Sequence, residues 1–334
     1  MEAGRPGRQA GRMIEVSGLT MRYGETVAVD DLSFTVRPGR VTGFLGPNGA
    51  GKSTTMRAVL RLEEAVAGQA LVCGRPYPSL RRPMRVMGTL LDAGAVHGGR
   101  TARAHVGCLA RSNGIAESRA AAVLAQVGLE EAAGKRISGF SLGMKQRLGI
   151  ATALLGDPEV LMFDEPLNGL DPEGIRWLRG LLRSLADEGR TVLVSSHLMN
   201  EMAQTADHVV VIGRGRLIAD VPTRELAARF ERDVLVRTDQ PQRLAEALRA
   251  VGAAVTTAVT TAVTTTGTTA GTVAADDGLS VRGLTSAGIG ALALRAGVAL
   301  SELTPRGASL EEAFMELTQD SVEYAGRGEA EVSR

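Results

Sequence analysis

A glycine-rich stretch with a single lysine is the part of this sequence best equipped to do chemistry. The pattern G-x-x-x-x-G-K-[ST] is complete, and Thr54 follows it; its residues are Gly46, Pro47, Asn48, Gly49, Ala50, Gly51, Lys52 and Ser53. In such a loop the backbone N–H groups surround phosphate oxygens, the lysine reaches the β- and γ-phosphates, and the serine hydroxyl ligates Mg²⁺. The sequence therefore predicts a site for a nucleoside triphosphate and its Mg²⁺.

Short elements on both sides of the loop would hold it in place. Residues 41–45 are apolar enough for a buried strand, and residues 53–62 have the apolar spacing of a helix. This order points the positive end of a helix at the phosphates. Only three of the 38 Lys and Arg residues are lysines, so Lys52 stands out in an arginine-rich chain. A flat guanidinium would not replace a compact ammonium in this crowded loop.

Two acids, Asp164 and Glu165, form a second candidate group directly after the apolar run 160–163. An acid pair after a strand is weak evidence alone, but beside a phosphate loop it has a specific chemistry. Asp164 would hold Mg²⁺ through its water shell, and Glu165 would polarise a water for in-line attack on the γ-phosphate. A helix over 173–187 and a further strand over 191–195 continue an alternation typical of parallel α/β sheets, whose sites lie at strand C-terminal ends.

Residues 140–147 read Phe-Ser-Leu-Gly-Met-Lys-Gln-Arg, and here the chain resembles an ABC ATPase. The signature of that family is L-S-G-G-Q followed by a glutamine and an arginine. The positions that match are Ser141, Gly143, Gln146 and Arg147. Leu142 and Met144 replace the first glycine and the glutamine. The resemblance implies that Ser141 and Gly143 contact ATP, whereas the alternative is an ordinary helix with Ser141 as its N-cap.

Three more residues lie where this family places functional groups. Tyr23 occupies the position of the aromatic residue that stacks on adenine. Asp171 belongs to residues 167–172, which resemble the D-loop, and His197 follows the strand 191–195 like the family's switch histidine. A lone tyrosine or histidine would more often be packing or surface. The resemblance covers residues 13 to about 222, and this order and spacing make coincidence a poor explanation.

One position departs from the family pattern. The family usually has glutamine at the start of the loop that leads into its helical subdomain, and alignment of residues 86–92 puts Asp92 there. A carboxylate could still face Mg²⁺ through water, although it adds negative charge near phosphates. The alternative is a surface loop residue. The coupling of this loop to a membrane partner is the part of the resemblance that Asp92 leaves open.

The resemblance also implies partners. Two nucleotide-binding domains would close head to tail, each ATP lying between one phosphate loop and the opposing Ser141 helix, so this chain needs a second copy or a paralogue. No apolar run approaches the roughly 18 residues of a membrane span, so a separate integral membrane permease would supply the spanning helices. A net charge of +1 gives no electrostatic argument for nucleic acid, and two cysteines make no disulfide framework. The expected location is the cytoplasm, at the inner face of the cell membrane through the permease.

The expected fold class is an α/β P-loop NTPase core of the ABC ATPase type, with an inserted helical subdomain and a small α+β, ferredoxin-like C-terminal domain. We expect a disordered tail at 1–12, which lacks the apolar segment of a signal peptide; Met13 is an alternative start. An ABC ATPase domain is expected at 13–222, with its helical subdomain at about 93–140. An accessory domain is expected at 223–323, with a Thr/Ala low-complexity insert at 253–275, and a disordered tail at 324–334.

Further elements follow from periodicity and turn residues. In the first domain we expect strands at 13–16, 27–29 and 32–36, a second strand pair at 70–73 and 86–91, and two amphipathic helices between 101 and 128. In the second we expect strands at 234–236, 279–281 and 299–300, and helices at 241–251, 286–296 and 310–317. If residues 253–275 add a strand, the order becomes β-α-β-β-α-β, a ferredoxin-like sandwich.

Within the family the chain most resembles the ATPase subunits of two-component exporters of drugs, antibiotics and lipid-linked compounds. Residues 310–314, Leu-Glu-Glu-Ala-Phe, resemble the C-terminal motif of those subunits, although a docking amphipathic helix would read the same. The predicted function is ATP binding and hydrolysis that powers export through the permease. Two alternatives stay open: a non-transport ABC ATPase acting on nucleic acid or ribosomes, and a regulatory half that binds ATP without turnover.

Overall fold

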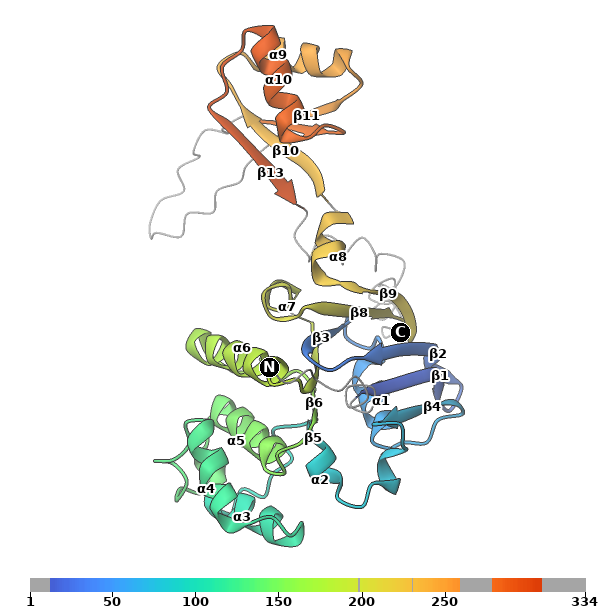
Figure 1. Cartoon of the computed structure of the whole chain (residues 1–334), viewed down its shortest axis with the longest axis vertical. Helices are drawn as coiled ribbons and strands as arrows, with labels where there is room; N and C mark the ends of the chain where they lie inside the picture. Colours follow the sequence, from blue (N-terminus) through green and yellow to red (C-terminus); the bar gives the residue numbers. More distant parts are fainter. Residues whose placement is uncertain (1–12, 198, 230, 259–277, 308–334) are drawn as a thin grey trace, which may run out of the picture. The chain divides into compact units, whose positions relative to one another are not determined.

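The computed structural model describes residues 13–197, 199–229, 231–258 and 278–307. The chain divides into two compact units, with the boundary between Thr223 and Arg224 (Figure 1). No helix among the described residues is both long and apolar enough to cross a membrane. The predicted tails, the greater part of the Thr/Ala tract and the predicted helix at 310–317 lie outside the described residues.

The first unit is built on a six-stranded sheet in the order β5-β6-β7-β3-β8-β9. Its strands are β3 (Arg40–Leu45), β5 (Met87–Leu90), β6 (Val160–Phe163), β7 (Thr191–Ser196), β8 (His208–Gly213) and β9 (Arg216–Pro222). The first five run parallel, and β9 is antiparallel to β8. Every residue of β6, β7 and β8 is buried, which explains why their sequences are continuous rather than alternating apolar runs.

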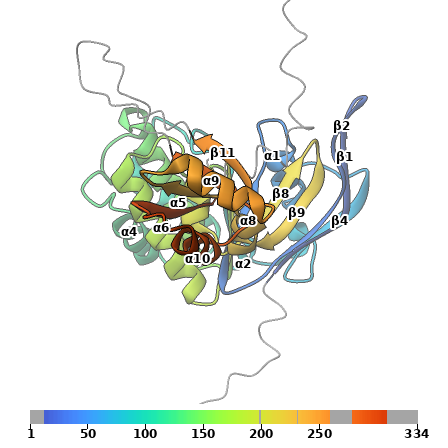
Figure 2. The same cartoon turned by 90° about the horizontal axis from the view of Figure 1, so that it is seen from above.

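A three-stranded antiparallel sheet, β2-β1-β4, accompanies the parallel sheet. It consists of β1 (Ile14–Tyr23), β2 (Thr26–Val36) and β4 (Ala67–Val72), and Figure 2 shows β2 next to β9. The rings of Phe34 and Phe44 stack with centroids 5.2 Å apart and join β2 to β3 within one buried core. The predicted pairing of 70–73 with 86–91 is wrong, because β4 pairs with β1 whereas β5 pairs with β6.

Helices cover and extend the parallel sheet. The phosphate loop leads into α1 (Lys52–Val59), which is shorter than predicted because Arg61 takes a left-handed φ of 55° that a right-handed helix cannot contain. The others in this unit are α2 (Pro83–Val86), α3 (Ala102–Ser112), α4 (Glu117–Gln126), α5 (Leu142–Leu154), α6 (Pro172–Asp187) and α7 (Met199–Thr205), with single 3₁₀ turns at Tyr77–Ser79 and Ile137–Gly139. A further helix, α8 (Thr223–Arg229), begins at the boundary between the two units.

The three helices α3, α4 and α5 pack together and bury small apolar side chains, including Val106, Ala110 and Val123 (Figure 1). The two amphipathic helices predicted between 101 and 128 are thereby confirmed as α3 and α4. The hydroxyl of Thr101 caps α3 by accepting a hydrogen bond from the N–H of Ala104 at 3.1 Å.

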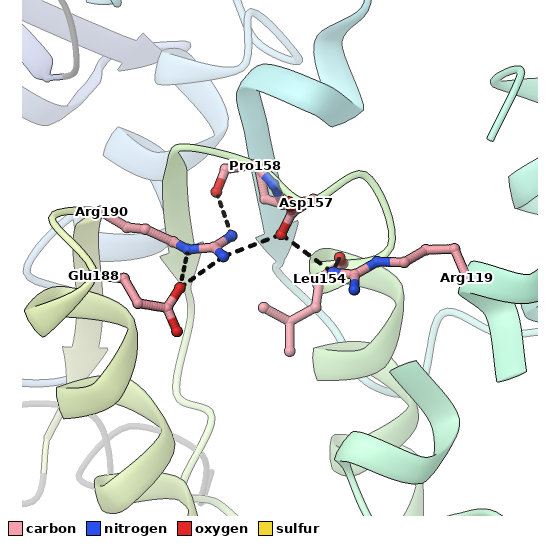
Figure 3. Close-up of polar contacts among 6 residues, drawn as sticks. All are labelled: Arg119, Leu154, Asp157, Pro158, Glu188 and Arg190. Carbon is pink, nitrogen blue, oxygen red and sulfur yellow. Dashed lines mark hydrogen bonds and ion pairs between the residues drawn. The ribbon is translucent and has the colours of Figure 1, made fainter. Parts of the chain in front are cut away.

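An ionic network ties α4 to the sheet (Figure 3). Arg119 of α4 contacts Asp157 at 3.2 Å and the carbonyl of Leu154 at 3.1 Å, in the turn between α5 and β6. Arg190, just before β7, contacts the same Asp157 oxygen at 3.0 Å and also binds Glu188 at 2.7 Å and the carbonyl of Pro158 at 2.9 Å. Asp157 therefore joins two arginines that belong to different layers.

Replacing Arg190 with methionine should destabilise the first unit by about 1–3 kcal/mol, because the side chain is only 19% exposed and its loss leaves the Pro158 carbonyl and Glu188 without this donor and Asp157 with Arg119 alone. The matched control is Arg111→Met, which breaks a pair with Glu117 whose side chains are 64% and 75% exposed. That control should change stability by about 0.5 kcal/mol or less. Denaturant unfolding of the two variants measures both, and equal effects would contradict the prediction.

The second unit is a four-stranded antiparallel sheet, β11-β12-β10-β13, with two helices. In chain order its elements are β10 (Glu231–Arg237), α9 (Pro241–Ala250), β11 (Ala254–Ala258), β12 (Gly278–Arg282), α10 (Ser286–Ala296) and β13 (Glu302–Gly307). The order β-α-β-β-α-β and the pairing of its strands confirm the ferredoxin-like prediction. The strand predicted at 299–300 is wrong, since the last strand begins at Glu302, after the N–H of Ser301 bonds to the carbonyl of Arg237 at 2.8 Å.

Candidate functional site

The candidate site forms where three neighbouring parallel strands end. The phosphate loop follows β3, Asp164 and Glu165 follow β6, and His197 follows β7. Strand β7 lies between the other two, with Leu45 of β3 beside Ser196 and Phe163 of β6 beside Val194. Because parallel strands end at the same edge of a sheet, residues far apart in the sequence meet here.

The glycines of the phosphate loop are required by close backbone contacts. A Cβ at Gly46 would lie 2.7 Å from the carbonyl oxygen of Ile212, and one at Gly51 would lie 2.6 Å from that of Ala28. Gly49 and Gly51 also have φ values of 80° and 99°, which L side chains rarely adopt. The loop ends directly at Lys52, the first residue of α1, so the unpaired N–H groups of the first helical turn belong to the site.

Lys52 is 6% exposed and spans the loop. Its Nζ donates to the carbonyl oxygen of Gly46 at 2.6 Å and to that of Pro47 at 3.3 Å, and it lies 3.7 Å from Oε1 of Glu165. Burial lowers the pKa of Lys52, and the negative charges of Glu165 and Asp164 oppose that shift. The structure thus brings together the predicted lysine and the predicted acid pair.

Glu165 has a left-handed backbone, with φ of 48°, which is uncommon for a residue other than glycine. One carboxylate oxygen faces Lys52, and the other lies 2.8 Å from Nδ1 of His197. Its carbonyl oxygen accepts a hydrogen bond from Nε2 of Gln146 in α5 at 3.4 Å. The two residues expected to be catalytic, Glu165 and His197, are therefore in direct contact.

Ser195 is a member of this site that the sequence analysis missed. It is fully buried in β7, and its hydroxyl donates to Oδ1 of Asp164 at 2.5 Å and accepts from the N–H of Glu165 at 2.8 Å. A serine inside an apolar strand is a weak signal. Its place two residues before His197, on the strand beside the one that ends in the acids, is the signal that could have indicated it.

Tyr23 ends β1 with its side chain 49% exposed. Its hydroxyl donates to Glu63, which also pairs with Arg57 at 3.3 Å. The hydrogen bond with Glu63 raises the pKa of Tyr23, burial adds to the rise, and a hydrogen bond with Thr54 opposes it. Because Glu63 also pairs with Arg57 of α1, the tyrosine lies beside the helix that follows the phosphate loop.

Ser141 and Asp171 cap helices. Ser141 begins α5 and accepts from the N–H of Met144 at 3.2 Å, which confirms the predicted N-cap, and Asp171 begins α6 and accepts from the N–H of Gly174 at 2.8 Å. A Cβ at Gly143 would lie 3.0 Å from the carbonyl oxygen of Gly169, so the start of α5 lies directly against the loop that leads to Asp171.

Asp92 is exposed, and its carboxylate accepts from the N–H of Gly94 at 2.6 Å, as in a local turn. Within the part of the chain that the structure describes, no hydrogen bond or ion pair joins Ser141, Gly143, Asp171 or Asp92 to the phosphate loop. The structure therefore gathers the residues of the loop with Asp164, Glu165, His197 and Tyr23, and leaves these four outside the group.

This fold and this loop define a P-loop nucleoside triphosphatase. Residues 29–168 match the family described as ABC transporter, and residues 269–311 match one described as a domain of unknown function. The chain is 41% identical over 220 residues to the bacitracin transport ATP-binding protein BcrA of Bacillus licheniformis, a match that covers 65% of this chain and 72% of that protein.

A second relative is the daunorubicin/doxorubicin resistance ATP-binding protein DrrA of Streptomyces peucetius, 38% identical over 254 residues, or 73% of this chain and 76% of that protein. A solved ATP-binding subunit of an ABC transporter superposes with a TM-score of 0.60 at 26% identity, covering 65% of this chain and 93% of that one. The chain belongs to the ABC transporter family as an ATP-binding subunit, and it is an ATPase. The predicted family, fold class and ATPase activity are confirmed.

Proposed function

We propose that this subunit powers export of an antibiotic-like or drug-like compound through a separate integral membrane permease, from the cytoplasmic face of the cell membrane. The observation that carries the proposal is the contact of Glu165 with both Lys52 and His197 at the end of the phosphate loop, an arrangement suited to hydrolysis and not only to binding. The export class rests on relatives named for bacitracin transport and for daunorubicin/doxorubicin resistance.

The site suits a triphosphate with Mg²⁺. The backbone of residues 46–53 and the first turn of α1 offer N–H groups where a Cβ would not fit. The described residues contain no group of three or more His, Cys, Asp or Glu side chains that could hold a metal by themselves. That fits Mg²⁺, which typically takes one or two protein ligands together with phosphate oxygens and water. Ser53 and Asp164 would hold it, and it would neutralise charge on the phosphates.

In the hydrolytic step Glu165 accepts a proton from the attacking water, and Lys52 neutralises charge on the β- and γ-phosphates. His197 holds Oε2 of Glu165, and Oε1, which faces Lys52 at 3.7 Å, is the oxygen that would take the proton from the water. Tyr23, exposed beside the helix that follows the phosphate loop, would offer its ring to the adenine. Ser141, Gly143 and Asp171 lie apart from the phosphate loop of their own chain. We therefore propose that they serve the ATP of a second nucleotide-binding domain, in a head-to-tail homodimer or with a paralogue.

Export is tested by coexpressing the chain with the permease encoded beside it in a drug-sensitive host. We expect resistance to rise at least about 4-fold toward bacitracin, a lantibiotic or daunorubicin, and we expect inverted vesicles to accumulate the same compound when ATP is added. Cells that express Glu165→Gln with the permease are the control and should stay sensitive. Equal sensitivity of the two strains to all three compounds would contradict the proposed substrate class.

A further inference from the structure

Ser195 joins the two acids of the site through one atom. Its hydroxyl oxygen donates to Oδ1 of Asp164 at 2.5 Å and accepts from the N–H of Glu165 at 2.8 Å. A hydroxyl has one proton to donate and two lone pairs to accept with, so both bonds form at once. Since a backbone N–H can only donate, the hydroxyl proton must go to the carboxylate. Ser195 therefore holds Oδ1 of Asp164 as an acceptor in a fixed orientation.

The bond to Glu165 acts on a backbone that needs support. The left-handed φ of 48° at Glu165 is unfavourable for a residue with a side chain, and such a conformation persists only where surrounding contacts hold it. The N–H of Glu165 donates to the hydroxyl of Ser195. The carbonyl oxygen of Glu165 accepts from Nε2 of Gln146 at 3.4 Å and from the N–H of Asn168 at 3.2 Å. This backbone directs the carboxylate toward Lys52 and His197.

Burial makes the arrangement rigid. Ser195 has no exposed surface and lies within β7, two residues before His197, so its position is fixed by the pairing of β7 with β3 and β6. Water cannot readily replace a hydroxyl in such a place. One strand thus fixes the acid that would bind Mg²⁺, the base and the histidine in contact with that base.

We propose that Ser195 is a positioning residue for ATP hydrolysis, which sets the carboxylate of Asp164 for Mg²⁺ and sets the backbone of Glu165 so that its carboxylate can take a proton from the water that attacks the γ-phosphate. This inference rests on the roles proposed above for those two acids. It assigns Ser195 no contact with ATP, so its effect should appear in turnover and in the requirement for Mg²⁺, and not in the affinity for nucleotide.

The test is Ser195→Ala in the full-length chain. We expect kcat to fall about 10- to 100-fold and the Mg²⁺ concentration for half-maximal activity to rise several-fold, as is typical when a group that orients a metal ligand is removed. The KM for ATP should stay within about 3-fold, because Lys52 and the phosphate loop are untouched. A purely structural role would lower the amount of folded enzyme without changing the Mg²⁺ dependence of the fraction that stays folded.

Two further variants separate hydrogen bonding from packing. Ser195→Cys keeps the side chain's volume but is a weak donor, so it should resemble Ser195→Ala. Thr42→Val removes another hydroxyl with no exposed surface from the adjacent strand β3, opposite Leu193 of β7, where the Thr42 Oγ1 atom has no hydrogen-bond partner among the described residues. Thr42→Val should leave kcat and the Mg²⁺ dependence unchanged. Binding of a fluorescent ATP analogue reports the folded sites in each preparation.

The inference would be overturned if Ser195→Ala kept the kcat and Mg²⁺ dependence of the parent, or if Ser195→Cys restored both. Glu165→Gln is assayed in parallel. Normal turnover from Glu165→Gln would refute the proposed base itself, whereas inactive Glu165→Gln together with a normal Ser195→Ala would refute only the role of Ser195.

Discussion

Replacing Glu165 with glutamine will lower ATP turnover by about 10²- to 10⁴-fold, the usual contribution of a general base, while ATP binding is kept. Glutamine has nearly the same shape but cannot take a proton from water. It also lacks the charge that faces Lys52 at 3.7 Å and His197 at 2.8 Å. Because cleavage is what would open a closed pair of cassettes, the variant should also remain dimeric in ATP. Single-turnover hydrolysis and size-exclusion chromatography with Mg·ATP measure these two results.

Glu173→Gln is the control for that prediction. Glu173 is an exposed acid in the first turn of α6, and its neutralisation changes the net charge by the same amount outside the group of contacting residues. Its turnover should match that of the parent. Normal turnover from purified Glu165→Gln would refute the assignment of Glu165 as the base.

Replacing Lys52 with alanine will abolish useful binding of Mg·ATP, with an affinity at least about 100-fold lower than that of the parent. Hydrogen bonds that involve a charged group contribute about 1.5–3 kcal/mol each, and this ammonium would make them to two phosphates. Lys52→Arg should also fail, because Nζ fits within 2.6 Å of the Gly46 carbonyl oxygen and a guanidinium is wider. Isothermal titration with Mg·ATP gives both dissociation constants.

The matched control is Lys135→Ala, which removes another of the three lysines at an exposed position in the turn between α4 and α5. Its dissociation constant for Mg·ATP should equal that of the parent. Equal affinities for the Lys52→Ala variant and the parent would disprove the phosphate loop as the nucleotide site, and with it the whole proposed mechanism.

The sequence was sufficient to predict those strands whose residues are all buried. The mainly apolar runs at 160–163 and 191–195 became β6 and β7, because a parallel strand covered on both faces has no solvent-facing positions at which polar residues would alternate. The phosphate loop was predictable for a different reason. A Cβ at Gly46 or Gly51 would lie within 3 Å of a backbone oxygen, and Gly49 has a positive φ, so the glycines of the motif cannot readily be exchanged.

Strand pairing was harder, because it depends on segments distant in the sequence. Residues 70–73 pair with β1, more than 50 residues earlier, and no local pattern distinguishes that partner from the next strand in the chain. β13 begins at Glu302 rather than at 299, directly after the N–H of Ser301 donates to the carbonyl oxygen of Arg237. Arg237 belongs to β10, which lies about 65 residues earlier in the sequence. Such contacts are invisible in a single sequence.

Within the site, the charged residues were predictable and their support was not. Glu165 and His197 have side chains whose chemistry marks them, whereas Ser195 acts through one hydroxyl in an apolar strand. Asp92 illustrates the opposite case, since its type suggests a metal ligand but its carboxylate serves a local turn with Gly94. Charge identifies candidates, and only the geometry shows which of them act together.

The contact between Gly143 and Gly169 has a consequence for timing. The beginning of α5 and the loop after Glu165 are packed so closely that a Cβ at Gly143 would lie 3.0 Å from the Gly169 carbonyl oxygen, so a shift of one element would press on the other. If α5 reaches the nucleotide of a second cassette, a change at either catalytic centre is transmitted to the other across a few backbone atoms. The activities of the two centres would then be coupled, and a dimer with one inactive centre should turn over ATP at less than half the rate of the parent.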